Sequence, residues 1–206
     1  MSQASPYKIR PTRSEMQQLP PFAGLDLTNI KVLSAPADIA TARAHLSQCQ
    51  VLGFDTESKP TFQVGEQSLG PHLVQLASDK VGYLFTLNDD LSNQLLTELL
   101  SSEQILKVGF GLKSDRGPLQ RKLGIELAGM HELSKRVKQL GYQHPVGLQG
   151  AVAILLEQYL VKSKRVALSN WAKPVLSEAQ IRYAANDAYA SLRIYQALAE
   201  RDAVCQ

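Results

Sequence analysis

The sequence predicts an α/β fold built on one mixed sheet, an antiparallel meander followed by parallel strands, with helices flanking it. Three apolar runs separated by segments of glycine, proline, serine and aspartate are typical of a meander. Further along the chain, strands and helices alternate, and this order favours parallel pairing. The chain has 206 residues, of which 44% are hydrophobic, so it can form one well-buried domain of ordinary size.

The expected elements begin at residue 30, where a polar segment gives way to apolar patterning. A short strand at Ile30 to Leu33 precedes a helix from about Pro36 to Gln48, and proline in the first turn suits the start of that helix. The meander occupies Val51 to Phe54, His72 to Ala77 and Val81 to Leu87. The remaining elements are expected as a helix at Asp90 to Ser101, a strand at Ile105 to Gly109, and helices at Ser114 to Leu123, His131 to Gln139, Gln149 to Tyr159 and Glu178 to Arg201.

Residues 1–28 are polar and carry several prolines, among them Pro6, Pro11, Pro20 and Pro21. Proline fixes φ and removes a backbone donor, so this segment is expected to be extended. We expect an N-terminal arm over residues 1–28 that is loosely packed or disordered, or that lies as a strap over the domain. The domain itself is expected over residues 29–206.

Composition narrows the class of protein. The formal net charge is +3, from 22 basic and 19 acidic residues, which suits a nucleic-acid partner without requiring one. Only two cysteines occur, Cys49 and Cys205, at unrelated positions and without metal-ligand spacing, so they indicate neither a disulfide scaffold nor a zinc site. The chain has no signal-peptide pattern, and no run reaches the roughly 18 apolar residues of a membrane span. We therefore expect an intracellular, cytoplasmic protein with no membrane partner.

Acidic residues on two distant elements are the clearest sign of chemistry. Asp55 and Glu57 stand two apart at the end of a predicted strand, and Tyr183 and Asp187 stand four apart on the last predicted helix. Each pair shares one face of its element, so three carboxylates and a phenol can converge. Carboxylates packed together repel unless they take up protons or a divalent cation neutralises them. Two alternatives stay open: Asp187 lies at a wet helix edge, and Asp115 serves only a helix dipole.

Three segments in this order resemble the exonuclease motifs of the DEDD superfamily of 3′→5′ exonucleases, in its tyrosine-bearing (DEDDy) branch. They are Phe54 to Glu57, Val108 to Asp115 and Tyr183 to Tyr189. Ser169 to Ser177 is similar to the matching segment of Werner-type exonuclease domains and, more loosely, of ribonuclease D. The resemblance spans about Ile30 to Ala199 and implies a ribonuclease H-like fold.

The resemblance implies a catalytic site formed by Asp55, Glu57, Asp115, Tyr183 and Asp187. The four carboxylates would bind two Mg²⁺ or Mn²⁺ ions, with Asp55 reaching both and Asp115 acting through water; oxygen ligands without a His or Cys cluster suit these metals. Two such ions, roughly 3.5 to 4 Å apart, support phosphodiester hydrolysis. Tyr183 would orient or deprotonate the attacking water, and positioning is the more plausible role because an unperturbed phenol has a pKa near ~10. The implied activity releases 5′-mononucleotides from a 3′ end.

The implied partner is a nucleic acid with a free 3′ end, and the Werner-type resemblance favours DNA. Trimming of structured RNA, as by ribonuclease D, is an alternative with the same chemistry. A non-catalytic nucleic-acid-binding module is another, and it predicts at least one missing carboxylate. Nothing resembling the helical binding domain of ribonuclease D follows Ala199, so substrate positioning is expected from this domain, its arm or a protein partner. The sequence indicates no oligomeric state.

Two groups of basic residues can track a phosphate backbone, although solvated helix faces explain them equally well. Trp171 can stack on a base, but a core position is the commoner role for such a residue. The same holds for Leu76, Phe110 and Leu112 near the motifs. The basic groups are Lys107, Lys113, Arg116, Arg121, Lys122, Lys135, Arg136 and Lys138, and then Lys162, Lys164 and Arg165.

Overall fold

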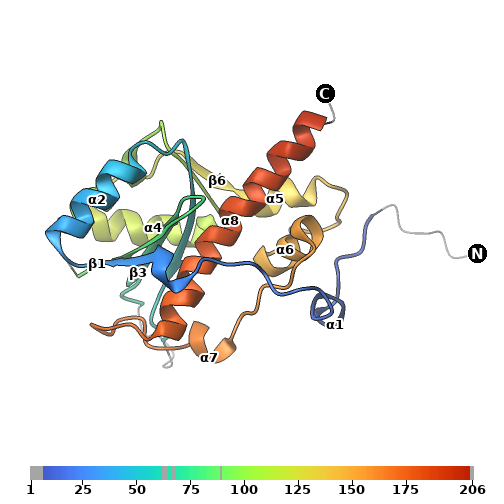
Figure 1. The fold of residues 1–206 in the computed structure, drawn as a ribbon, viewed down its shortest axis with the longest axis horizontal. Helices are drawn as coiled ribbons and strands as arrows, with labels where there is room; N and C mark the ends of the chain where they lie inside the picture. Colours follow the sequence, from blue (N-terminus) through green and yellow to red (C-terminus); the bar gives the residue numbers. More distant parts are fainter. Residues whose placement is uncertain (1–6, 62–64, 66–67, 89, 205–206) are drawn as a thin grey trace, which may run out of the picture.

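Six strands form one mixed sheet in the computed structural model, which describes residues 7–61, 65, 68–88 and 90–204 (Figure 1). The strands are β1 (Ile30–Leu33), β2 (Val51–Glu57), β3 (Leu73–Ala77), β4 (Gly82–Thr86), β5 (Leu106–Gly109) and β6 (Met130–Glu132). Their order across the sheet is β1-β4-β3-β2-β5-β6. Strands β2, β3 and β4 pair antiparallel as the expected meander, whereas β1 joins β4, β5 joins β2 and β6 joins β5 in parallel. The predicted mixed sheet is confirmed.

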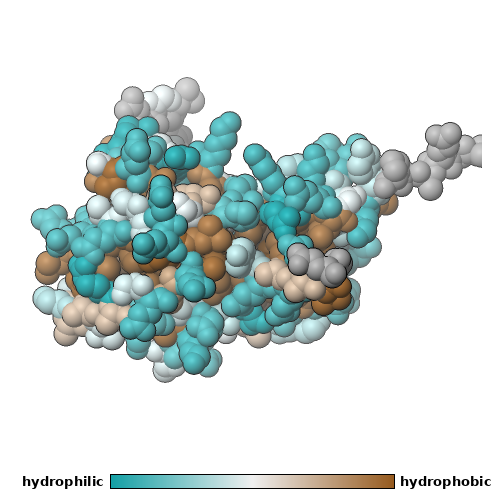
Figure 2. Space-filling model, turned by 90° about the horizontal axis from the view of Figure 1, so that it is seen from above, coloured by the Kyte–Doolittle hydropathy of each residue, from teal (hydrophilic) through white to brown (hydrophobic). Residues whose placement is uncertain are grey.

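Helices lie on both faces of the sheet. They are α1 (Arg13–Met16), the 3₁₀ turn η1 (Leu27–Asn29), α2 (Pro36–Leu46), α3 (Asp90–Ser101), α4 (Leu112–Leu123), α5 (Leu133–Lys138), α6 (Leu148–Leu156), α7 (Lys164–Ala167) and α8 (Glu178–Val204). Within the described residues, none of them combines the length and apolar character that crossing a membrane requires. Figure 2 shows mainly hydrophilic residues on one face of the molecule, with hydrophobic residues visible between them.

The prediction of a helix at His131 to Gln139 is wrong for the first turn. Residues Met130–Glu132 instead form β6 at the edge of the sheet, and α5 begins at Leu133. Glu132 marks the change, because its carboxylate accepts a hydrogen bond from the backbone N–H of Ser134 at 3.0 Å and caps the helix. A strand of three residues is too short to show a period of two in the sequence.

Strand β3 shows how the sheet separates two apolar layers. Val74 and Leu76 pack in the layer formed with α2, α3 and α4, whereas Leu73 and Ala77 pack with α8. Alternate residues of a strand point to opposite faces, so the single strand serves both layers. Helix α8 thus covers one face of the sheet, and Figure 1 shows it running diagonally across the molecule.

Gly53 in β2 lets α8 approach the sheet more closely than a side chain would allow. A Cβ at this position would lie 1.9 Å from the backbone oxygen of Ala188 and 3.1 Å from the Cβ of Leu192. Since such a distance to a backbone oxygen is sterically forbidden, only glycine fits here without moving the helix. Asp55 follows two residues later on the same face, so this approach brings α8 beside the acidic end of β2.

Residues 7–28, called the strap below, run along the domain and are held by backbone contacts. The N–H of Phe22 donates to the carbonyl of Tyr159 at 2.9 Å. Further on, the N–H of Leu25 donates to Oδ1 of Asn186 in α8, also at 2.9 Å. These bonds place the strap beside α8 and the segment before α7. Residues 1–6 of the expected arm lie outside the described residues.

Gly53→Ala is expected to lower the free energy of unfolding by ~2 kcal/mol or more, because the added methyl group forces α8 away from β2. Urea denaturation followed by circular dichroism measures this change. Gly147→Ser is the control, since a Cβ there meets nothing within 4 Å and serine is a good residue at the start of a helix. Equal stability of Gly53→Ala and the parent protein would contradict the proposed constraint.

Candidate active site

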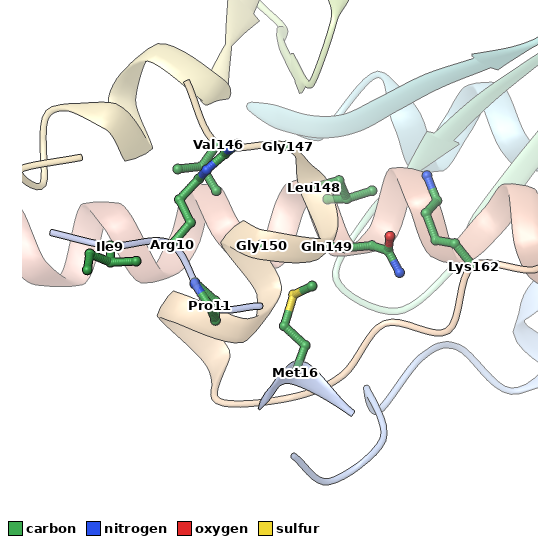
Figure 3. A pocket seen from close by; sticks show the side chains of 10 residues that line it. All are labelled: Ile9, Arg10, Pro11, Met16, Val146, Gly147, Leu148, Gln149, Gly150 and Lys162. Atoms are coloured by element: carbon green, nitrogen blue, oxygen red, sulfur yellow. The ribbon is translucent and has the colours of Figure 1, made fainter. Parts of the chain in front are cut away.

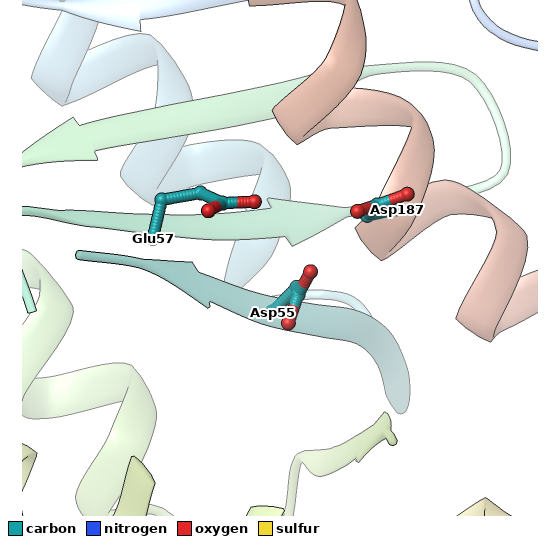
Figure 4. A group of neighbouring side chains, drawn as sticks. All are labelled: Asp55, Glu57 and Asp187. Atoms are coloured by element: carbon teal, nitrogen blue, oxygen red, sulfur yellow. The ribbon is translucent and has the colours of Figure 1, made fainter. Parts of the chain in front are cut away.

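Three acidic side chains meet where the end of β2 lies beside α8. Asp55 and Glu57 come from β2 and Asp187 comes from α8, and Figure 4 shows the three carboxylates gathered between the two elements. Each residue offers one oxygen, and these oxygens all lie within 4.8 Å of one another. The structure therefore brings together the three carboxylates that the two sequence periodicities place on facing surfaces.

Lys162, in the segment between α6 and α7, places a positive charge against this cluster. Its Nζ lies 2.7 Å from Oδ2 of Asp187, a carboxylate that is only 2% exposed. The same Nζ lies 5.4 Å from the ring centroid of Tyr183, within the range of a cation–π contact. A buried carboxylate without a partner is very costly, so Lys162 stabilises Asp187 where it stands. One ammonium group nevertheless faces three carboxylates.

Burial and mutual repulsion change the protonation of all three carboxyl groups. Burial, followed by the charge of Asp187, raises the pKa of Asp55 to about 8. Burial, followed by the charge of Asp55, raises the pKa of Glu57 to about 9. Burial also raises the pKa of Asp187 to about 6, although Lys162 opposes the rise. Without a further cation, the cluster therefore retains protons at neutral pH.

The two groups beside the cluster keep their protons as well. Burial, followed by the charge of Asp187, raises the pKa of Tyr183 to about 12, so its phenol is neutral at physiological pH. For Lys162, burial alone would lower the pKa of the amine. The carboxylates of Asp187 and Asp55 outweigh that effect and raise its pKa above the ordinary value. The site thus holds a neutral hydroxyl and a permanent positive charge.

Asp115, the fourth expected carboxylate, lies in the first turn of α4 and is not part of the group of three. It is tied to β2 through Thr56, whose Oγ1 donates to Oδ1 of Asp115 at 3.1 Å. Its charge still contributes to the raised pKa values of Asp55 and Glu57, after burial and nearer charges. Asp115 is therefore close enough to influence the cluster electrostatically.

The chemistry of this donor set suits a hard divalent cation such as Mg²⁺ or Mn²⁺. The group of three contains only carboxylate oxygens, which these ions prefer, and no His or Cys. Gln75 adds a second observation, because it stands directly opposite Asp55 on β3 and is fully buried. Its amide nitrogen and oxygen have no hydrogen-bond partner among the described residues. Leaving such an amide unpaired costs ~1–3 kcal/mol, so the face beside Asp55 is built for polar contacts.

Two other candidates from the sequence have structural roles. Trp171 is 2% exposed and its ring N–H donates to the carbonyl of Ala167 at 3.1 Å, so it belongs to the core. Lys107 is fully buried, and its Nζ donates to the carbonyls of Leu99 and Ser102 at the end of α3. The interpretation of Lys107 as a phosphate contact is therefore wrong.

The sequence predicts the wrong surroundings for Lys162, a further candidate for a functional role. The sequence groups it with Lys164 and Arg165, and those two are exposed. Lys162 instead turns inward to Asp187. Because it lies in an irregular segment, no helical or strand periodicity could have indicated that orientation.

Two cavities flank the carboxylates. One, of about 300 Å³, is lined by Tyr183 and Asp187 together with Phe22 of the strap. The other, of about 660 Å³, is lined by Thr56 and Asp115. Open space therefore lies beside Asp187 and beside Asp115, and a substrate needs such space in order to reach them.

A comparison with protein families decides the class of this chain. The model of the 3′-5′ exonuclease family matches residues 30–201, which is most of the sequence. The chain belongs to the 3′-5′ exonuclease family. The expected membership is thus confirmed, and the three acidic residues of the cluster all lie within the matched range.

Relatives within the exonuclease family agree with this result. The bifunctional 3′-5′ exonuclease/ATP-dependent helicase WRN of Mus musculus is 35% identical over 155 residues, which cover 74% of this chain and 11% of that protein. Ribonuclease D of Gluconacetobacter diazotrophicus is 29% identical over 173 residues, covering 82% of this chain and 42% of that protein. The chain therefore spans less than half the length of either relative.

Solved exonuclease structures share the fold. The EXO domain of Nibbler from Aedes aegypti matches with a TM-score of 0.74 and 23% sequence identity, covering 88% of this chain and 92% of that one. The ribonuclease H-like architecture expected from the sequence is thereby confirmed.

The thermal stability of the metal-free protein is expected to fall as pH rises from about 5 to 8.5. Asp55 and Glu57 retain protons in the folded protein up to pKa values of about 8 and 9, whereas the unfolded chain releases them near ~4. Ionising them therefore costs the folded state, and the stability present at acidic pH is lost through this window. Melting in the presence of a chelator should show a fall of ~5 °C or more, and millimolar Mn²⁺ should raise the melting temperature more at pH 8.5 than at pH 5.5.

The double variant Asp55→Asn, Glu57→Gln provides the control, because amides cannot ionise and the pH dependence should flatten. Burial lowers the pKa of Lys107 to about 8, so this residue also affects stability in this pH range. Its contribution is the same in the parent and in the variant, and it therefore drops out when the two proteins are compared. A variant that retains the full slope would show that other groups cause it. An equal Mn²⁺ effect at both pH values would contradict the assignment of the cluster as a cation site.

Proposed function

We propose that this chain is a metal-dependent 3′→5′ exonuclease that hydrolyses the terminal phosphodiester of a nucleic-acid strand and releases 5′-mononucleotides. The observation that supports it most strongly is the convergence of Asp55, Glu57 and Asp187 within 4.8 Å, in a chain of the exonuclease family. A non-catalytic binding module would be expected to have lost at least one carboxylate. All four are present, including Asp115 in α4.

In this proposal Asp55, Glu57 and Asp187 would hold one Mg²⁺ or Mn²⁺ ion, and Asp55 and Asp115 would hold a second, Asp115 through water. Bound divalent ions of this kind stabilise the charge that develops on the attacking water and on the leaving 3′ oxygen. The carboxylates must lose their protons to act as ligands, and their raised pKa values make that loss depend on the arriving positive charge. Thr56 orients Asp115 by its hydrogen bond.

Tyr183 positions the attacking water in this proposal. With a pKa raised to about 12, its hydroxyl stays protonated and can donate or accept a hydrogen bond, whereas removal of a proton from water would require the phenolate. Lys162 remains charged beside Asp187, where it can attract a phosphate group of the substrate.

The substrate in this proposal is a strand with a free 3′ end, and the Werner-type segment before Tyr183 favours DNA. Trimming of structured RNA is the second candidate, because the family also includes ribonuclease D and the chemistry at phosphorus is the same. The choice depends on contacts to the 2′ position of the sugar. A protein partner or the strap would supply further positioning.

The activity is tested with DNA and RNA strands labelled at the 5′ or the 3′ end, both single-stranded and in duplexes, with Mg²⁺, Mn²⁺ or a chelator. We expect stepwise shortening from the 3′ end, immediate loss of a 3′ label as a mononucleotide, faster cleavage of DNA than of RNA, and no reaction with the chelator. Asp55→Asn should reduce the rate by ~100-fold or more. Asp38→Asn, which removes the same charge from the exposed start of α2, should not.

Shortening from the 5′ end, or cleavage that persists in the chelator, would contradict the proposed activity. Full activity of Asp55→Asn would contradict the ligand assignment alone. Faster cleavage of RNA than of DNA would leave the mechanism standing and select the ribonuclease D-like candidate.

Tyr183→Phe is expected to lower kcat by ~10-fold or more, because the hydroxyl that orients the water is lost while the ring remains. The rise in melting temperature with Mn²⁺ should stay as in the parent, since the carboxylates are unchanged. Tyr195→Phe, on the same helix but lining a different cavity, serves as the control and should retain full activity. An unchanged kcat for Tyr183→Phe would show that the hydroxyl has no positioning role.

A further inference from the structure

A third cavity lies between the strap and the beginning of α6, and we call it the strap groove. It has a volume of about 530 Å³, within the range of roughly 300–1,000 Å³ typical of ligand sites. Figure 3 shows Arg10 and Lys162 toward opposite ends of it, with Gln149 of α6 between them. The lining residues are Ile9, Arg10, Pro11, Met16, Val146, Gly147, Leu148, Gln149, Gly150 and Lys162.

The strap groove is joined to the catalytic cluster by Lys162. The side chain of Lys162 lines the groove, and its Nζ reaches Oδ2 of Asp187 at 2.7 Å. At the other end the groove meets solvent, because Ile9 is 87% exposed and Arg10 is exposed as well. It therefore runs from Lys162, which contacts Asp187, to the edge of the molecule. A continuing strand requires such an open path, whereas a terminal nucleotide requires a closed pocket.

The charge of the strap groove complements a phosphate backbone. Two of its ten lining residues, Arg10 and Lys162, are cationic and none is acidic. The first backbone N–H groups of α6 also border it, and Gly147 provides no side chain to cap them. Between these donors stands the half-buried apolar side chain of Met16, which can contact the face of a base. The combination of cationic ends and apolar walls suits single-stranded nucleic acid.

Hydrogen bonds fix the position of the strap, so the residues that it contributes to the groove are held in place. The backbone N–H of Lys8 donates to the carbonyl of Gly141 at 2.9 Å, just before Arg10. Just after it, Thr12 and Glu15 form a reciprocal capping box at the start of α1. Further along, the backbone N–H of Tyr159 donates to the carbonyl of Pro20 at 2.7 Å, so hydrogen bonds attach the strap to the domain on both sides of Arg10.

We propose that the strap groove binds the nucleotides on the 5′ side of the scissile phosphodiester, with Arg10 contacting a backbone phosphate. This proposal rests on the proposed exonuclease function and adds the path of the strand. It assigns to the strap a role in substrate affinity and none in the chemical step. Arg10 is accordingly a binding residue.

The test compares Arg10→Glu with Arg13→Glu on two substrates. Arg13 lies three residues further along the strap, is exposed and does not line the groove, so both variants change the net charge equally. The substrates are a single-stranded oligonucleotide of about 12 nucleotides and the p-nitrophenyl ester of thymidine 5′-monophosphate, which has no upstream phosphate. Arg10→Glu should raise KM for the oligonucleotide by ~10-fold with kcat within about 2-fold of the parent, and leave hydrolysis of the ester unchanged.

A second measurement isolates the phosphate contact. Arg10→Ala should reduce the slope of log affinity against log salt concentration by about 1, measured by fluorescence anisotropy of the labelled oligonucleotide in chelator. Arg13→Ala should leave the slope as in the parent. Melting temperatures of all four variants, expected to match the parent, show that the fold is retained.

The outcomes distinguish a failure of the groove proposal from a failure of the proposed function. If the parent protein hydrolyses neither substrate, the proposed function fails. If the parent is active but Arg10→Glu and Arg13→Glu raise KM equally, only overall charge matters and the groove proposal is overturned. It is likewise overturned if Arg10→Glu has no effect, or if it slows hydrolysis of the ester as much as that of the oligonucleotide.

Discussion

Helix α8 lies against β2 at Gly53 with no side chain between them, and the acidic cluster depends on that contact. A helix held further from the sheet would carry Asp187 away from Asp55 and Glu57, whose oxygens now lie within 4.8 Å of it. Packing beside α8 also leaves Asp55 and Glu57 half-buried, and burial is the largest cause of their raised pKa values. The absence of a side chain at Gly53 therefore lets the acidic groups come together, and their close packing raises the free energy of their charged forms.

A residue from an irregular segment offsets part of the free-energy cost of these negative charges. Lys162 reaches Asp187 from the connection between α6 and α7, and its ammonium stands on a flexible stem that can adjust as the charge around it changes. Gln75, buried opposite Asp55 without a partner among the described residues, shows that the surrounding sheet is also not fully apolar. Positive charge and unpaired polar atoms thus collect around the same few carboxylates.

The sequence was sufficient for those parts of the structure that follow from short periodicities. The positions of Asp55 and Glu57 on one strand face and the alternation of strands and helices follow from local rules. The strand Met130–Glu132 could not be predicted, because its three residues gain their pairing only from the neighbouring β5. The positive charge of Lys107 was misleading, because this side chain is buried and its Nζ donates hydrogen bonds to carbonyls at the end of α3. Contacts from distant segments decided both cases, and single-sequence patterns do not record them.

The strap lies outside the range that the exonuclease family model matches, since the match begins at residue 30 and the strap ends at residue 28. The four carboxylates and Tyr183 all lie inside the matched range, residues 30–201. In the proposed arrangement, substitutions in residues 7–28 change how firmly a strand is bound while the acidic cluster stays the same. Four of the ten residues that line the strap groove lie outside the matched range and six lie inside it, so in the proposed arrangement residues 7–28 can tune substrate affinity without touching the acidic cluster.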